Sequence, residues 1–290
     1  MNPDSLLTLT PPDTATASSS GSAGRLSVLT WNVQHASAER SIRQAAWLAA
    51  RPDAQVVVLT EVGHGPGGTA VISALTDHGY TCLTAQSRAP AGYRTVIASR
   101  CAAPQPLDCG ITVLGHRAVA ATMDLDGHQV AVLGLYVPSR GPREHRNRDK
   151  RAFQEAAAAA LHGLLARIDG LLVVAGDLNV LEPGHRPHYR LFGTWEYDFY
   201  RAFATAGLLD AYRVLHPDTV EHSWYGRGGN GYRFDHTFVT TRHAHRLLEC
   251  RYLHAPRQAG LSDHAAMTAT VALTDPATPG TTADLEGIPV

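Results

Sequence analysis

Residues 171–179 read Leu-Leu-Val-Val-Ala-Gly-Asp-Leu-Asn, and this stretch combines a buried strand with a polar end. Its leading apolar residues follow a helix-stopping Asp-Gly pair and are typical of a strand that is covered on both faces. Gly176 allows the backbone to turn close to a ligand, and alternation along an extended chain places Asp177 and Asn179 on the same side. We therefore expect a central strand whose carboxyl end carries functional side chains.

Three other short segments also place polar side chains beside an apolar run. They read Trp31-Asn32-Val33, Thr60-Glu61-Val62 and Ser262-Asp263-His264. Strand ends present rigid, convergent side chains to a ligand. Carboxylates, amides and an Asp-His pair that converge in this way suit the binding of a hard cation and the hydrolysis of a phosphate ester.

Composition limits the class of protein. The 290 residues are 44% hydrophobic and 18% charged, which describes a globular protein with a substantial core. No apolar run approaches the ~18 residues of a membrane span, and no secretory signal is evident. We therefore expect a cytoplasmic protein whose scattered cysteines are reduced. A formal net charge of −1 argues against a generic nucleic-acid coat but leaves room for a local basic surface.

Hydrophobic periodicity divides the chain into strands and helices between two polar ends. Residues 1–24 are rich in Ser, Thr, Ala, Pro and Gly, so we expect this segment, and the tail over 275–290, to be disordered. The strand pattern indicates two sheets packed face to face with helices outside. The expected helices span 41–50, 68–78, 151–168, 197–206 and 208–215, and the later strands span 118–125, 128–137, 234–240, 245–253 and 265–273.

A further run of motifs lies between Asn179 and Ser262. Residues 207–213 read Gly-Leu-Leu-Asp-Ala-Tyr-Arg, Ser223-Trp224 follows, and 230–236 read Asn-Gly-Tyr-Arg-Phe-Asp-His. With these motifs in this order, the sequence resembles the endonuclease/exonuclease/phosphatase superfamily, and most closely its exonuclease III and abasic-site endonuclease branch. The resemblance implies an α/β fold, namely a four-layer α/β/β/α sandwich of two packed mixed β-sheets flanked by helices, with the catalytic domain over 25–274.

Three residues are candidates for holding a metal ion. Glu61 ends an apolar strand with no basic residue nearby in the sequence, so a purely structural carboxylate there would be costly to bury; the alternative is an exposed strand-end glutamate. The family's metal-binding glutamate falls at this position. Asn32 is expected to bind the metal or to orient a neighbouring carboxylate, unless it only forms a turn. The resemblance adds Asp263 to the metal site and implies Mg²⁺, although Mn²⁺ suits the same oxygen ligands.

Five residues are candidates for catalysis. Asp177 is positioned to take a proton from an attacking water while Asn179 donates to the phosphate, unless Gly-Asp-x-Asn is an ordinary turn. The resemblance implies that His264 stabilises the phosphoryl oxygens and that Asp235 orients its ring. It also assigns Tyr136 to the phosphate or the attacking water, although a phenol at a strand end can simply pack.

Candidates for substrate contact are more scattered. Arg100 follows a strand, where the exonuclease III branch has a basic residue, and we expect it to contact a substrate phosphate. Arg140 and Trp224 are expected to stack on or brace a nucleotide, as are Tyr93 and Trp195, although core packing is the stronger interpretation for Trp224. The basic stretch over 143–151 is either a phosphate-contacting patch or the solvated start of a helix.

We expect a Mg²⁺-dependent phosphodiesterase whose leading substrate is DNA, cut at abasic sites or from 3′ ends. The alternative is a phosphatase or phosphodiesterase acting on a small-molecule or lipid phosphoester with the same site. The near-neutral charge and the divergent loop over 181–195 favour this alternative, because loops beside a site set substrate choice on a shared scaffold. A catalytically silent binding protein is a third possibility, but every core catalytic position holds a competent residue. No protein partner is evident.

Overall fold

The computed structural model describes residues 24–85, 92–141 and 144–275. The segments 1–23 and 276–290, where we expected disorder, lie outside the described residues. The first part of the chain forms β1 (Arg25–Asn32), α1 (Ala38–Ala49), β2 (Val56–Val62), α2 (Pro66–Asp77), β3 (Thr81–Thr84), β4 (Arg94–Ser99), β5 (Gln105–Leu107), β6 (Ala118–Leu125) and β7 (His128–Tyr136). The second part forms α3 (Glu144–Arg167), β8 (Leu171–Asp177), α4 (Thr194–Ala206), β9 (Leu208–Asp210), α5 (Ala211–Leu215), β10 (Trp224–Tyr225), β11 (Gly231–Tyr232), β12 (Asp235–Thr240), β13 (Leu247–Leu253), α6 (Ala255–Gln258) and β14 (Ala266–Ala272).

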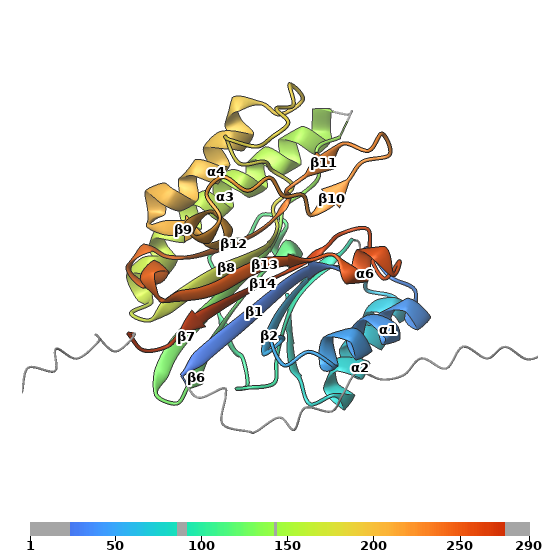
Figure 1. Ribbon diagram of the computed structural model, residues 1–290, viewed down its shortest axis with the longest axis vertical. Helices are drawn as coiled ribbons and strands as arrows, with labels where there is room; N and C mark the ends of the chain where they lie inside the picture. Colours follow the sequence, from blue (N-terminus) through green and yellow to red (C-terminus); the bar gives the residue numbers. More distant parts are fainter. Residues whose placement is uncertain (1–23, 86–91, 142–143, 276–290) are drawn as a thin grey trace, which may run out of the picture.

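The larger strands pair into two mixed sheets. The first sheet has the order β13-β14-β1-β2-β4-β3, and the second has the order β5-β6-β7-β8-β12-β9. β1 is parallel to β2 and β7 is parallel to β8, whereas β12 and β14 run antiparallel to their neighbours β8 and β1. Figure 1 shows α1 and α2 beside the first sheet and α3 and α4 beside the second. These four layers confirm the expected sandwich.

Alternation along the strands distributes the apolar side chains over three layers of core. Val28 and Val58 of the first sheet share a buried cluster with Val132 and Val173 of the second, so the two sheets pack directly on each other. The residues that alternate with these along a strand point to the other face of the sheet. Leu59, next to Val58, therefore packs in the cluster beneath α1 and α2. A third cluster joins the outer face of the second sheet to α3 and α4.

Local signals explain where the helices begin and end. Ser37 is the N-cap of α1, and its hydroxyl accepts from the backbone N–H of Arg40. Gly207 ends α4 with a positive φ of 96°, which a glycine adopts at little cost.

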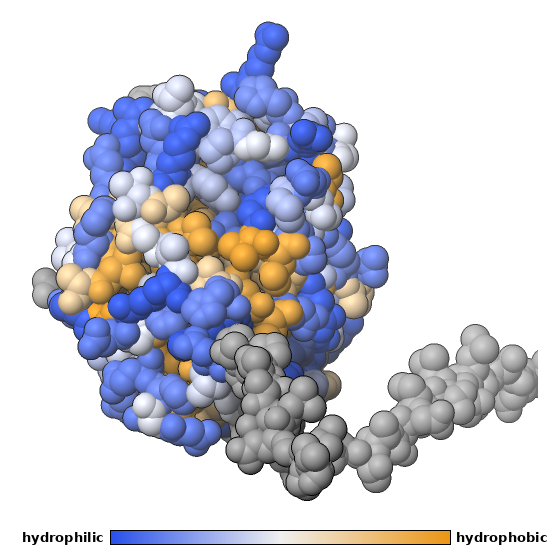
Figure 2. All heavy atoms as spheres, turned by 60° about the vertical axis from the view of Figure 1, so that its left-hand side comes forward, coloured by the Kyte–Doolittle hydropathy of each residue, from blue (hydrophilic) through white to orange (hydrophobic). Residues whose placement is uncertain are grey.

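Across the face drawn in Figure 2, hydrophilic side chains surround a central apolar area. Within the described ranges, no helix is both long and apolar enough to cross a bilayer.

Most of the expected elements are present, and one is wrong. The hairpin of β6 and β7 turns at Asp126 and Gly127, as the sequence indicates. The expected helix over 208–215 is instead the short strand β9 followed by α5, because residues 208–210 pair with β12 at the edge of the second sheet. The short strands β3, β5, β10 and β11 were not expected, since two to four residues are too few to show a period.

Candidate active site

One row of the second sheet carries three of the expected catalytic side chains. Tyr136 at the end of β7 lies opposite Asp177 at the end of β8, and Asp177 lies opposite Asp235 at the start of β12. The β12 strand runs antiparallel to β8, so its first residue meets the last residue of its neighbour. Strand register therefore places a phenol and two carboxylates side by side.

The first sheet brings two more side chains to the same edge. Asn32 and Glu61 end the parallel strands β1 and β2, and Asn32 is buried. Glu61 has a φ of 57° at an irregularity in the pairing of β2 with β4. A glutamate rarely adopts this left-handed conformation, and such strained residues cluster at functional sites. The strain supports a function for Glu61 beyond strand pairing.

Asp177 is the centre of the hydrogen-bond network. Its Oδ2 accepts from the side-chain amide of Asn32 at 2.9 Å and from that of Asn179 at 3.0 Å, and its Oδ1 accepts from the Asn179 backbone N–H at 2.9 Å. Burial, together with the nearby carboxylates of Asp235 and Glu61, raises the pKa of Asp177 to about 7, although His264 opposes this shift. A carboxylate with this pKa can accept a proton near neutral pH.

Asn179 holds Asp177 in this structure. Its side-chain amide also donates to the Val137 carbonyl at 3.0 Å, so both of its N–H groups are engaged. The expectation that Asn179 donates directly to phosphate would require one of these bonds to break. Its φ of 49° is in the left-handed region, which asparagine tolerates better than most residues.

His264 and Asp235 form a buried pair, as expected for an oriented histidine. The Nδ1 atom of His264 lies 2.7 Å from Oδ2 of Asp235. Burial alone would lower the pKa of His264, but the charge and hydrogen bond of Asp235 outweigh it and raise the pKa to about 10. The Ser262 hydroxyl donates to the Asn32 carbonyl at 2.6 Å and accepts from the His264 backbone N–H at 3.1 Å, which fixes the position of His264.

Tyr136 contacts the expected metal ligand. Its hydroxyl donates to Oε1 of Glu61 at 2.8 Å, and burial, followed by the charge of Glu61, raises the pKa of Tyr136 well above its usual value. Tyr136 is therefore a neutral donor that orients Glu61. The guanidinium of Arg117 lies 4.3 Å from the centre of the Tyr136 ring, in a cation–π arrangement.

A pocket of about 430 Å³ opens onto these groups. Its lining includes the polar side chains of Glu61, Asp177, Asn179 and His264 and the aromatic side chains of Phe192, Trp224, Tyr232 and Phe234. The remaining expected residues that line it are Arg140 and Asp263. The indole N–H of Trp224 donates to Asp263 at 2.9 Å, so Trp224 is a wall of the pocket as well as part of an aromatic cluster.

The donor set fits a hard cation. Glu61, Asp177 and Asp263 present carboxylate oxygens to one region, and none of them forms an ion pair with a lysine, arginine or histidine of the described residues. Burial, and after it the charges of Asp235 and Glu61, raise the pKa of Asp177 although His264 opposes the shift, so the region around Asp177 disfavours further negative charge. Asp177, Asp235 and His264 also offer ligand atoms within 4.8 Å of one another. Because Nδ1 of His264 and Oδ2 of Asp235 bond to each other, the carboxylates of Glu61 and Asp263, which form no ion pair with the described residues, are the better ligands for Mg²⁺ or Mn²⁺.

Arg100 is not part of this site. The β4 strand runs antiparallel to β2, so Arg100 follows the end of β4 at the opposite edge of the sheet, where its backbone N–H donates to Gln55. Its guanidinium donates to the carbonyls of Ala49 and Arg51. Trp195 packs against the cationic groups of the α3 side chains 150 and 151, outside the pocket lining. The centres of the Tyr93 and Tyr136 rings are 6.3 Å apart, so Tyr93 lies beside the site.

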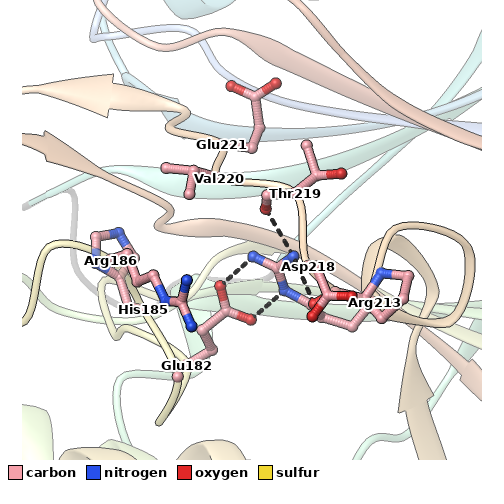
Figure 3. Close-up of a pocket in the computed structure, with 10 residues that line it drawn as sticks. Glu182, His185, Arg186, Arg213, Asp218, Thr219, Val220 and Glu221 are labelled. Atoms are coloured by element: carbon pink, nitrogen blue, oxygen red, sulfur yellow. Dashed lines mark hydrogen bonds and ion pairs between the residues drawn. The ribbon is translucent and has the colours of Figure 1, made fainter.

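A second pocket, drawn in Figure 3, has a structural explanation. Its volume is about 270 Å³, and the bidentate pair of Glu182 and Arg213 lies at its base. Arg213 also donates to the carbonyls of His216 and Thr219, and Glu182 also pairs with buried Arg233. The charges of Glu182 and Arg213 are therefore compensated by ion pairs, unlike those of Glu61 and Asp263.

Sequence reasoning missed several residues around the site. Arg117 follows a short turn before β6 and gave no motif. Lys150 belongs to the basic stretch over 143–151, yet its side chain is fully buried and pairs with buried Glu196. One signal was available, because Lys150 is the one lysine among 25 basic side chains. The side chain of Arg143, at the other end of that stretch, lies outside the described residues.

Comparison with known proteins identifies the family. The Endonuclease/Exonuclease/phosphatase family model matches residues 29–264, and the chain belongs to this family of phosphoester hydrolases. A search of curated proteins finds no match. The fold is shared with solved structures at low identity.

Three of these structures show the extent of the shared fold. A 3′-5′ exonuclease, NExo, from Neisseria meningitidis is 24% identical with a TM-score of 0.69, covering 84% of this chain and 98% of its own. An AP endonuclease from Archaeoglobus fulgidus is 21% identical, with the same TM-score and the same coverage. A structure of the 3′ phosphatase NExo bound to a product DNA hairpin is 23% identical and also has a TM-score of 0.69, with the same coverage.

Proposed function

We propose that this protein is a Mg²⁺-dependent phosphodiesterase that cleaves DNA at abasic sites or at 3′ ends. The observation that supports the chemistry best is the group of carboxylates of Glu61, Asp177 and Asp263 that line one pocket beside the His264–Asp235 pair. A Mg²⁺ ion held by Glu61 and Asp263, with Asn32 nearby, would neutralise phosphate charge and activate the leaving oxygen. Mn²⁺ would serve the same ligands.

The side chains of the pocket then have distinct tasks. Asp177 accepts the proton of the attacking water, because its pKa of about 7 suits a base near neutral pH. Asn32 and Asn179 hold its carboxylate in place. Protonated His264, kept charged by Asp235, donates to the phosphoryl oxygens as their negative charge grows.

A basic surface beside the pocket favours a nucleic acid as substrate. Arg94 and Arg117 form no ion pair with any acidic side chain of the described residues, and each has a buried guanidinium nitrogen without a hydrogen-bond partner there. His64 and His116 are close enough to these arginines for the arginine charges, after burial, to lower the pKa of each imidazole. Tyr93 adds an aromatic face beside Tyr136, and its ring also lies against that of His35. Phosphates flanking the scissile one would pair with the positive charges of these partly exposed arginines.

The alternative, a small phosphoester substrate, is supported by the aromatic lining of the pocket. The segment between β8 and α4 places Phe192 against Phe234 and narrows the opening with exposed Leu191. An aromatic wall around about 430 Å³ would accommodate a single small ester. The basic surface at Arg94 and Arg117 has no task with such a substrate, so we place DNA first.

The test is cleavage of a labelled duplex that carries one abasic site. The parent protein is assayed with Mg²⁺ or with EDTA, beside Asp177→Asn and a matched control, Asp124→Asn, which changes an exposed carboxylate on the hairpin. We expect Mg²⁺-dependent nicking by the parent and the control, and none by Asp177→Asn. If the folded parent leaves all DNA intact but hydrolyses bis(p-nitrophenyl) phosphate with Mg²⁺, the DNA assignment is wrong and the chemistry stands.

A further inference from the structure

Lys150 is a buried charge that the chemistry above does not use. It lies on α3 with no exposed surface, and its ammonium is 2.5 Å from Oε1 of Glu196, which is equally buried on α4. Burial lowers the pKa of Lys150, although Glu196 and then Asp177 oppose this shift. Burying an ion pair is costly and contributes little to stability compared with apolar packing. The one lysine of the chain therefore calls for a reason beyond packing of the two helices.

The ammonium of Lys150 also reaches the residue that holds the catalytic carboxylate. Its Nζ donates to the backbone carbonyl of Asn179 at 2.8 Å. Asn179 is in the left-handed conformation, and its backbone and side-chain N–H groups both donate to Asp177. A charged hydrogen bond to the carbonyl keeps this peptide in place, because such bonds are short and stronger than neutral ones.

Glu196, the partner of Lys150, also bonds a residue that lines the pocket. Its Oε2 accepts from Nη1 of Arg140 at 2.6 Å and from the backbone N–H of Gly193 at 2.9 Å. The side chain of Arg140 is 30% exposed and lines the same pocket as the carboxylates. One ion pair is thus bonded to Asn179 and to Arg140, which lie on different loops after β8 and β7.

We propose that Lys150 and Glu196 are positioning residues that set Asn179, and through it Asp177, and also Arg140, for the reacting phosphate. This inference rests on the proposed function for its kinetic consequence. Lys150 is suited to the task because a compact ammonium can contact a carboxylate and a carbonyl in a space closed by Phe192 and Trp195.

Lys150→Met tests the proposal, with Arg213→Met as the matched control. Arg213 also bonds a buried glutamate and backbone carbonyls, but at the second pocket. Both substitutions should lower the urea midpoint of unfolding. With the abasic duplex and Mg²⁺, we expect Lys150→Met to lower kcat at least ~10-fold with KM changed less than ~3-fold, and Arg213→Met to leave kcat within ~2-fold. An equal kcat in the two variants would overturn the proposal.

A double-mutant cycle separates positioning from general destabilisation. Asn179→Ala removes the side chain that holds Asp177 but keeps the backbone carbonyl that Lys150 bonds. If Lys150 acts in part through Asn179, Lys150→Met should therefore lower the single-turnover rate by a smaller factor in the Asn179→Ala background than in the parent, whereas independent effects would multiply. Multiplied effects would contradict the proposal.

A spectroscopic measurement does not depend on activity. The chain has five asparagines, so ¹⁵N-asparagine labelling gives few side-chain amide signals. We expect the Asn179 signals to shift in Lys150→Met and to stay in place in Arg213→Met; unmoved signals in both would refute positioning. A parent that does not cleave DNA, combined with shifted Asn179 signals, would reject the proposed substrate and keep the positioning pair.

Discussion

The side chain of Asn32 bonds directly to Asp177 across the interface between the two sheets. Its Nδ2 on β1 lies 2.9 Å from Oδ2 of Asp177 on β8, and both side chains are buried. The two strands belong to different sheets, so this hydrogen bond forms only when the sandwich is closed at this edge. Formation of the hydrogen-bond network around Asp177 is therefore coupled to packing of the two sheets.

Asn32→Ala should lower kcat by more than a general disturbance of β1 would. The change leaves buried Asp177 with one fewer donor, and loss of such a supporting partner typically costs ~10–100-fold in activity. We expect kcat on the abasic duplex to fall by this factor. Ser27→Ala is the matched control, because Ser27 bonds Thr270 near the other end of the same strand, and its kcat should remain within ~2-fold of the parent. A similar loss in both variants would show that damage to β1 alone is the cause.

Asp235→Asn should remove the charge that keeps His264 protonated. The pKa of His264 is raised to about 10 in the folded protein, above the ordinary histidine value of 6.5. The stabilisation from this pair is therefore complete below about 6.5 and is lost as pH rises through about 10. Titration of the His264 ring by NMR, assigned by comparison with His264→Gln, should show its pKa falling toward 6.5 in Asp235→Asn. A pKa that remains near 10 would mean that another group holds the proton.

Much of the candidate site could be predicted because its residues occupy strand ends. Apolar runs locate β1, β2 and β8, and the polar residues that follow them must lie at an edge of a sheet. Asn32, Glu61 and Asp177 all lie at that edge. Arg100 also follows a strand, but sequence does not show strand direction, and antiparallel pairing of β4 places Arg100 at the far edge.

Buried charges were harder to predict for a different reason. Lys150 stands among charged residues at the start of a helix, where side chains are usually solvated. Its burial depends on α4 packing against α3 and on Glu196, which lies 46 positions away in sequence. A local pattern carries no information about such a partner, although the rarity of lysine in this chain was a signal.

Stability at acid pH should depend on Glu182. Burial would raise the pKa of Glu182, but its bonds to Arg213 and Arg233 outweigh this and lower the pKa from 4.5 to about 2. The stabilisation from these ion pairs of Glu182 is present above pH of about 4.5 and is lost as pH falls through about 2. We expect Glu182→Gln to lower the free energy of unfolding at pH 7 by up to about 3 kcal/mol, with a smaller difference from the parent at pH 3. Urea unfolding at both pH values measures this. Asp198→Asn, in an exposed pair with Arg201, should change neither value, and a Glu182→Gln deficit that is constant with pH would contradict the assignment.

Arg117 should contribute to DNA binding through a phosphate. It forms no ion pair with the described residues and lies over the Tyr136 ring beside the pocket. Neutralising one phosphate releases counterions, so the slope of log Kobs against log salt should become shallower by about 0.9 in Arg117→Ala. The binding of an uncleaved duplex to the Asp177→Asn background, measured by fluorescence anisotropy from 50 to 200 mM salt (roughly the range over which this effect is large), gives the slope. Arg201→Ala on α4 serves as the control, because Arg201 is exposed and pairs with Asp198. If the two arginine variants give the same slope as their background, Arg117 contacts no phosphate and the basic surface beside the pocket loses its main support as a DNA-binding face.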